Sequence, residues 1–339
     1  MDNWSTFSSI IASMDLSIVP FTVEHEQAFD AFVAKSRNGT IFHTRRFLAY
    51  HSTGKFQDAS LMFFDGEKLV AVLPAALKEE NGRNMLVSHP GASYGGLVLG
   101  EEISVTETGE LMNNLLAYAK AQNDAGVSFL RLSPASLQKS YSEDQLYWAF
   151  QKGFQMTRCE MDGAIDLTGM KEDQVLARLP GKCRNMIRQA ERAKIEVKLS
   201  NDFVSFWPIL ESVLAQRHGA KPTHTLEEIE KLHELLPDDF RCLCAYREGA
   251  MVGGIVLVTI HEQALYTLYM GQKYSEQEHH PMHALLAEAM KLAIREKRRV
   301  LHLGVSTEDG GTKVNEGLFF FKESFGCKPV RRESWELMF

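Results

Sequence analysis

The spacing of hydrophobic and polar residues predicts alternating strands and helices along the first half of the chain. Asp65-Gly66 separates two apolar, β-rich runs and is typical of a hairpin turn. Thr44 fits the N-cap position of a short helix. The elements predicted here are strands at 16–20, 59–64, 68–77, 83–88 and 127–132 and helices at 24–36, 44–51, 103–122 and 142–151.

The second half repeats this order of elements. The pattern predicts strands at 240–246, 251–260, 264–270 and 300–303 and helices at 281–297 and 314–325. Helical runs at 170–193, 202–219 and 226–236 lie between the copies. We therefore predict an α/β fold with mixed α+β sheets, built from two copies of one unit and divided into residues 1–168 and 169–339.

Length and composition agree with two globular domains. The chain has 339 residues, of which 45% are hydrophobic and 24% charged, and its net charge is −7. This length favours two domains, and the negative charge argues mildly against a protein that coats nucleic acid. No apolar run reaches the roughly 18 residues that a membrane span needs, and residues 1–17 do not read as a secretion signal.

The cysteines predict a reducing environment. There are five of them, an odd number without a regular framework, so we expect a cytoplasmic protein. Cys242-x-Cys244 has the spacing of half a metal site, but it falls within a predicted strand where alternate residues share one buried face. We interpret the pair as core thiols and predict no metal site.

The stretch Gly304–Gly326 stands out in the second copy. A polar, glycine-bearing loop leads into a helix that carries three consecutive phenylalanines and then Lys322. When the copies are aligned, Phe150 matches Phe321, Phe154 matches Phe325 and Gln151 matches Lys322. We infer that the phenylalanines serve the fold, whereas Lys322, with Asn315 on the same flank, is a candidate for function.

Four motifs together resemble the duplicated form of the Gcn5-related N-acetyltransferase (GNAT) fold. They are residues 182–190 (KCRNMIRQA), 216–219 (QRHG), 266–271 (YTLYMG) and 321–326 (FKESFG). This form occurs in Fem-type peptidyltransferases and in acetyltransferase-like proteins linked to envelope polysaccharides. The resemblance implies two tandem GNAT-like domains, an acceptor groove between them, and acyl transfer to an amine near the Phe-Lys motif. We therefore expect Lys322 and Arg217 both to face solvent or ligand in that groove.

The resemblance also suggests roles for particular residues. Lys322 would stabilise the negative charge that develops on the carbonyl oxygen, with Phe321 beside it as a catalytic or a core residue. Arg217 matches an acceptor-side arginine that could hold a phosphate or carboxylate, or it complements the dipole of its helix. Tyr269 matches a pocket position, with a core tyrosine as the alternative.

Other candidates come from the residues alone. Tyr94 lies in a loop with three glycines (residues 89–96) and is a candidate acceptor contact, as is Asn315. Lys182 and Arg184 begin a basic stripe that either is solvated or binds a phosphate-rich ligand. The general base stays open among four residues near the loop: His302, Glu308, Asp309 and Glu316.

The acyl donor and the acceptor are left open. Acetyl-coenzyme A is one candidate donor, but residues 271–281 lack the glycine turn that lets backbone N–H groups approach a pyrophosphate. Aminoacyl-tRNA, the Fem-type donor, is the other. A small-molecule acceptor such as a nucleotide-linked amino sugar is the leading hypothesis. The alternatives are a tRNA-dependent peptidyltransferase and a non-catalytic binding module.

Overall fold

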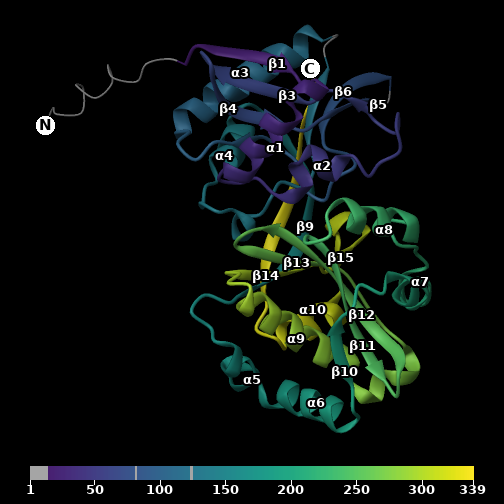
Figure 1. The fold of residues 1–339 in the computed structure, drawn as a ribbon. Helices are drawn as coiled ribbons and strands as arrows, with labels where there is room; N and C mark the ends of the chain where they lie inside the picture. The colour runs from purple at the N-terminus through teal and green to yellow at the C-terminus, as the bar shows by residue number, and fades with distance from the viewer. Residues whose placement is uncertain (1–13, 81, 123–124) are drawn as a thin grey trace, which may run out of the picture.

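The computed structural model describes residues 14–80, 82–122 and 125–339 of the chain. Figure 1 shows two halves joined end to end, with long strands running from one into the other. The strands of the first half are β1 Leu16–Pro20, β2 Gln57–Asp58, β3 Leu61–Asp65, β4 Lys68–Leu73, β5 Ala76–Glu80, β6 Arg83–Ser88, β7 Val98–Leu99, β8 Gly126–Phe129 and β9 Gln155–Asp166. Its helices are α1 Glu26–Lys35, α2 Arg45–Leu48, α3 Val105–Ala121 and α4 Asp144–Gln151. The predicted mixed α/β class is confirmed.

The second half is also built from both strands and helices. Its strands are β10 Glu196–Leu199, β11 Phe240–Arg247, β12 Ala250–His261, β13 Ala264–Gln272, β14 Val300–Val305, β15 Thr307–Glu308, β16 Lys313–Val314 and β17 Lys328–Leu337. Its helices are α5 Val175–Arg178, α6 Gly181–Arg192, α7 Phe203–His218, α8 Leu226–Leu235, α9 Pro281–Arg295 and α10 Glu316–Glu323.

Local sequence signals explain where several elements begin and turn. The Thr44 side chain accepts from Phe47 N and caps α2, as predicted. Pro281 opens α9, where a missing N–H costs nothing. The β11–β12 hairpin turns at Glu248 and Gly249, which both have positive φ, as its tight two-residue turn requires.

An eleven-stranded sheet crosses both halves in the order β10-β11-β12-β13-β14-β9-β17-β8-β6-β5-β2. Strand β9 belongs to the first half in sequence, yet it pairs with β14 of the second half. Strand β17 belongs to the second half, yet it lies between β9 and β8. The halves therefore exchange their final strands. Neither strand is predicted by the hydrophobic pattern.

The predicted strand at 68–77 is wrong in its extent. The chain breaks at Pro74, so that β4 joins a four-stranded sheet, β1-β3-β4-β7, while β5 joins the large sheet. Proline has no N–H to donate to a ladder, which explains the break.

The apolar core is continuous across the junction of the halves. One buried cluster contains Phe42, Phe47 and Tyr94 from the first half together with Phe240 and Tyr266 from the second. Phe47 stacks on Phe240 with ring centroids 5.9 Å apart. Burial of such large rings favours a fixed arrangement of the halves.

Candidate functional site

A buried polar cluster lies where the two halves meet. Its members, each at most 8% exposed, are Tyr94, Asp162, Tyr266, His302 and Arg332; we call them the polar cluster. The loop that carries Tyr94 comes from the first half, and the strands β9, β13, β14 and β17 supply the rest. Polar groups in such a dry location are costly unless they are paired.

Asp162 is the centre of this cluster. Tyr94 Oη donates to Asp162 Oδ2 at 3.2 Å, and His302 Nε2 lies 4.0 Å from the same oxygen. Arg332 Nε is 3.8 Å from Asp162 Oδ1, while Arg332 Nη2 donates to Glu160 Oε2 at 2.8 Å. The charge of Asp162 is therefore balanced by Arg332, and among the described residues its side chain accepts one hydrogen bond, from Tyr94.

Burial sets the protonation states of the cluster. It lowers the pKa of His302 to about 4, so the imidazole is neutral near pH 7. Burial also raises the pKa of Tyr94, and Asp162 adds to this effect. For Arg332, burial opposes the charge, but Asp162 and its neighbours outweigh it and hold the pKa above its ordinary value.

Several buried atoms of the cluster have no hydrogen-bond partner among the described residues. They are Asp162 Oδ1, both ring nitrogens of His302 and Arg332 Nε. Buried polar atoms in native proteins are nearly always satisfied by protein, water or a ligand. The cluster therefore has unused hydrogen-bonding capacity next to the end of β14.

The neighbouring strands separate at this point. The parallel ladder between β13 and β14 joins only residues 264–266 with 300–302, although β13 continues to Gln272. Tyr266 is the last residue of β13 that pairs with β14, and its ring stacks on that of His302 with centroids 5.6 Å apart. The polar cluster thus sits where the sheet begins to split.

Lys322 lies behind the cluster and is only 1% exposed. Its Nζ donates to Gly304 O at 2.8 Å, to Val305 O at 2.9 Å and to Ser306 Oγ at 2.7 Å. Burial lowers its pKa to about 8, although Asp162 favours the charged form. The expectation that Lys322 faces solvent or ligand in a groove is wrong, because all three donors bind the end of β14.

Phe321 and Asn315 also have contacts within the fold. Phe321 is half-buried and packs edge-on against His283 of α9, with centroids 5.2 Å apart. Asn315 caps α10: its Oδ1 accepts from Leu318 N at 3.0 Å and its Nδ2 donates to Glu308 Oε1 at 2.8 Å. Their suggested roles in function stay predictions.

The aligned phenylalanines behave differently from one another. Phe154 and Phe325 are both buried, at 2% and 1% exposure, as expected of fold residues. Phe150 is 68% exposed, so the inference that it is needed by the fold is wrong. It lies on the outer face of α4, whereas Phe321 is covered by α9.

Tyr94 and Tyr269 lie in different surroundings. Tyr94 is fully buried and its hydroxyl faces Asp162. The glycine loop around it approaches the chain itself, since a Cβ on Gly95 would lie 1.8 Å from Ser88 O. Tyr269 is half-buried and its Oη is 2.7 Å from His224 Nδ1. The structure therefore does not bring the two tyrosines to one pocket.

The predicted basic residues lie on or near the outside of the second half. Lys182 Nζ sits 6.0 Å from the ring centroid of the exposed Phe320, and Arg184 Nη1 donates to Ala177 O at 3.2 Å. Arg217 falls in α7, but its side chain is outside the described residues, so its role stays a prediction.

Sequence reasoning missed Asp162 and Arg332 and left His302 as one of four candidate bases. The first two lie on β9 and β17, the strands that the pattern did not predict. One signal was available: Glu160 and Asp162 alternate in a way that places two carboxylates on one face of a strand.

The start of α9 offers no free backbone donors to a phosphate. Met282 N donates to Gln272 Oε1 at 2.9 Å, and His283 N and Ala284 N donate to His280 O at 3.0 and 3.4 Å. Pro281 has no N–H. Glu276, just before this helix, is paired with Arg247 at 3.1 Å. This agrees with the missing glycine turn.

The described residues show neither a metal-ligand cluster nor a membrane-spanning helix. Among residues 14–80, 82–122 and 125–339, no group of three or more His, Cys, Asp or Glu side chains is placed to hold a metal. In the same part of the chain, no helix combines the length and apolar character that crossing a bilayer requires. Cys242 and Cys244 are fully buried in the core, as interpreted.

The fold and one family match define the class of protein. Residues 180–311 match the family described as "Acetyltransferase (GNAT) domain". This segment contains α6 to β14 and includes His302 of the polar cluster. No curated protein matches the chain.

Solved structures extend the likeness to both halves. A crystal structure of FemX aligns with 95% of this chain and 97% of its own, at 13% identity and a TM-score of 0.72. A tandem GNAT protein from the clavulanic acid biosynthesis pathway covers 96% and 98%, at 11% identity and a TM-score of 0.55. The structure of L-PGS from Bacillus licheniformis aligns with 93% of this chain and 91% of its own, at 12% identity and a TM-score of 0.55.

The resemblance stated from the motifs is therefore confirmed. Residues 180–311 match the acetyltransferase (GNAT) domain family, and the whole chain has the fold of tandem GNAT and Fem-type proteins. The chain thus has a GNAT-type acyltransferase fold.

Proposed function

We propose that the chain transfers an acyl group to an amine, with the polar cluster as its reaction centre. The observation that carries this proposal is the set of unpartnered atoms on Asp162, His302 and Arg332 where β13 and β14 separate. Buried, strongly perturbed groups of this kind are typical of functional sites. Within a GNAT-type fold, acyl transfer is the chemistry that they favour.

His302 is the group best suited to accept the proton. The amine nitrogen forms a bond to the acyl carbonyl carbon, and the bond from that carbon to the leaving oxygen or sulfur breaks. The neutral imidazole takes the proton released by the amine and returns it to the leaving group. Asp162, 4.0 Å from His302 Nε2, stabilises the imidazolium that forms in between.

Lys322 supports this centre through the backbone. Its ammonium holds Gly304, Val305 and Ser306 in place immediately after His302. The positive charge also lies close enough to His302 to lower its pKa. We propose that Lys322 fixes the end of β14 and contributes positive potential, with no direct bond to the substrate.

The acceptor in this proposal is the amine of a cell-envelope or polysaccharide precursor, such as a nucleotide-linked amino sugar. A thermal-shift panel of acetyl-coenzyme A, charged tRNA and nucleotide-linked amino sugars identifies the ligands, since each true ligand raises the melting temperature by mass action. Pairs of ligands that raise it are then assayed for the acylated product by mass spectrometry.

One observation favours aminoacyl-tRNA as the donor in a second version of this function. Arg178, Lys182, Arg188 and Arg192 of α5 and α6 form no ion pair with a described carboxylate. Gln189 Oε1 contacts His280 Nε2 at 2.9 Å, which places α6 beside the start of α9. Such cations suit a nucleic-acid backbone, and a tRNA response in the thermal-shift panel supports this version over coenzyme A.

The reaction centre is tested with a matched pair of histidine variants. His302→Gln removes the proton acceptor, so we expect kcat to fall about 10²–10⁴-fold. His261→Gln is the control, since burial also lowers its pKa to about 4 but its Nε2 contacts Leu137 O at 2.6 Å, outside the cluster. Full turnover by His302→Gln would remove the polar cluster from the proposal. If no acyl donor yields an acylated product with the unaltered chain, the non-catalytic binding module is favoured instead.

A further inference from the structure

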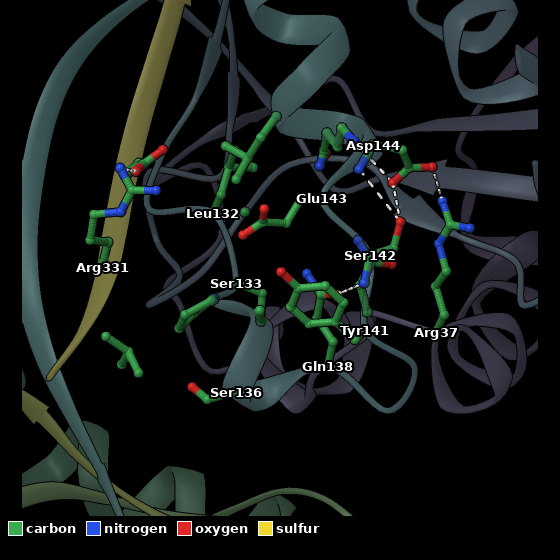
Figure 2. A pocket seen from close by; sticks show the side chains of 18 residues that line it. Arg37, Leu132, Ser133, Ser136, Gln138, Tyr141, Ser142, Glu143, Asp144 and Arg331 are labelled. Carbon is green, nitrogen blue, oxygen red and sulfur yellow. Dashed lines mark hydrogen bonds and ion pairs between the residues drawn. The ribbon is translucent and has the colours of Figure 1, made fainter. Parts of the chain in front are cut away.

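A separate cavity of about 220 Å³ lies in the first half of the molecule. The loop at 132–138, the start of α4 and residues 330, 331 and 333 of β17 line it. Figure 2 shows Arg331 of β17 on one side and the pair Arg37 and Asp144 on the other. None of the five polar-cluster residues lines this cavity.

The side chains at the start of α4 that line the cavity are held by an ion pair and hydrogen bonds within the protein. Arg37 forms a buried ion pair with Asp144, and Thr108 Oγ1 donates to Asp144 Oδ2 at 2.6 Å. Ser142 Oγ donates to Asp144 Oδ1 at 2.7 Å, while Ser142 N donates to Gln138 Oε1 at 2.8 Å. These contacts fix the start of α4, so the cavity is held in shape without a ligand.

By contrast, several groups that line the cavity are unpaired. Ser133 Oγ and Ser136 Oγ are buried without a hydrogen-bond partner among the described residues. Glu143, at the exposed mouth of the cavity beside the 72% exposed Tyr141, occupies the N-cap position of α4 without a capping bond and has no ion-pair partner in the described chain. Figure 2 shows Glu143 and Tyr141 among the residues in the middle of the lining.

The opposite wall is neutral overall. Arg331 Nη1 pairs with Glu333 Oε1 at 3.0 Å, so its charge is matched there. Glu143 therefore leaves the cavity with an unmatched negative charge. The volume of about 220 Å³ is below the roughly 300–1,000 Å³ of pockets for drug-sized ligands and suits a single small ring.

We propose that this cavity binds a small hydroxylated amine of the amino-sugar type. The Glu143 carboxylate pairs with the ammonium, and the aromatic face of Tyr141 adds to the attraction of a cation. The Ser133 and Ser136 oxygens are buried as they stand, so in this proposal the two side chains rotate toward the cavity to bond the hydroxyl groups of the ring. This binding needs no acyl donor, so its failure would leave the proposed acyl transfer untouched.

Isothermal titration calorimetry on the full chain tests the proposal with glucosamine as the probe. Glucose and N-acetylglucosamine lack the ammonium, and we expect each to bind at least 10-fold more weakly. Ethanolamine has the ammonium and one hydroxyl but no ring, and it too should bind at least 10-fold more weakly. Equal affinity for glucose would overturn the ammonium site, and equal affinity for ethanolamine would overturn the sugar ring.

Matched variants locate the binding. Glu143→Gln and Tyr141→Ala should each weaken glucosamine binding by 10-fold or more. Their controls are Glu79→Gln, an exposed carboxylate on β5, and Tyr147→Ala, a 53% exposed tyrosine of α4 that does not line the cavity. If Glu143→Gln binds glucosamine as well as the unaltered chain, or if no glucosamine binding is measured at all, the proposal is wrong.

Discussion

The contacts of Lys322 separate two roles that a lysine in this position can have. An exposed ammonium would meet a substrate directly, but this one donates all of its hydrogens to Gly304, Val305 and Ser306. A buried ammonium bound by neutral oxygens is stable only because those bonds replace water. The residue therefore shapes the end of β14 whether or not it also takes part in catalysis.

This burial predicts how stability depends on pH. An ordinary lysine has a pKa of 10.5, whereas that of folded Lys322 is about 8, so between these values the unfolded chain holds a proton that the folded chain has lost. The free energy of unfolding therefore rises with pH across this window, and the burial cost is fully present below pH 8. Relative to Lys322→Met, the unaltered chain should gain about 3 kcal/mol between pH 8 and 10.5.

Urea unfolding of both proteins at several pH values checks this difference. The exposed Lys313, which pairs with Glu308 at 2.8 Å, gives the control Lys313→Met, whose difference from the unaltered chain should stay constant between pH 8 and 10. A difference for Lys322→Met that is flat or falls with pH would contradict the buried ammonium.

At the scale of elements, the sequence predicts the helices and strands that bury one face, because their hydrophobic residues recur at a regular spacing. The structure has the hairpins where the turn residues predict them, and it has the amphipathic helices α3 and α9 where the hydrophobic spacing predicts them. Strands β9 and β17 carry charged residues because they hold the polar cluster, as Asp162 and Arg332 illustrate. Their pairing joins segments far apart in sequence, so the hydrophobic pattern indicates neither strand, and the alternation of Glu160 and Asp162 is the one local signal of the site.

The exchange of β9 and β17 bears on the proposed division at residue 168. Fragment 1–168 lacks β17, which normally separates β8 from β9, and fragment 169–339 lacks β9, the neighbour of β14. We predict that neither fragment unfolds cooperatively alone and that mixing them restores the transition. Near-ultraviolet circular dichroism during urea unfolding measures this.

The control for the fragments is removal of residues 338–339 alone. They follow the last residue of β17, so we expect a change within about 0.5 kcal/mol. A sharp transition of either fragment by itself would instead favour two independent domains and a sheet that joins them only after each has folded.

At the scale of the whole molecule, the junction is dry and rich in neutral imidazole. Burial lowers the pKa of His43 to about 4, of His89 to about 3 and of His302 to about 4. Each of these side chains is at most 4% exposed. Near pH 6 these three imidazoles are therefore neutral in the folded protein, whereas in the unfolded chain they are largely protonated.

Acid should therefore begin to destabilise the chain above the pH at which carboxylates titrate. Below pH 6.5 the unfolded chain binds protons at these histidines that the folded chain does not, so the free energy of unfolding falls with pH, by about 5 kcal/mol between pH 6.5 and 5 if all three contribute. Urea unfolding at intervals of pH measures the slope, which reports the number of protons taken up. His43→Gln and His302→Gln should each reduce it by about one proton. A slope that neither variant changes would mean that the buried histidines are not the groups that titrate.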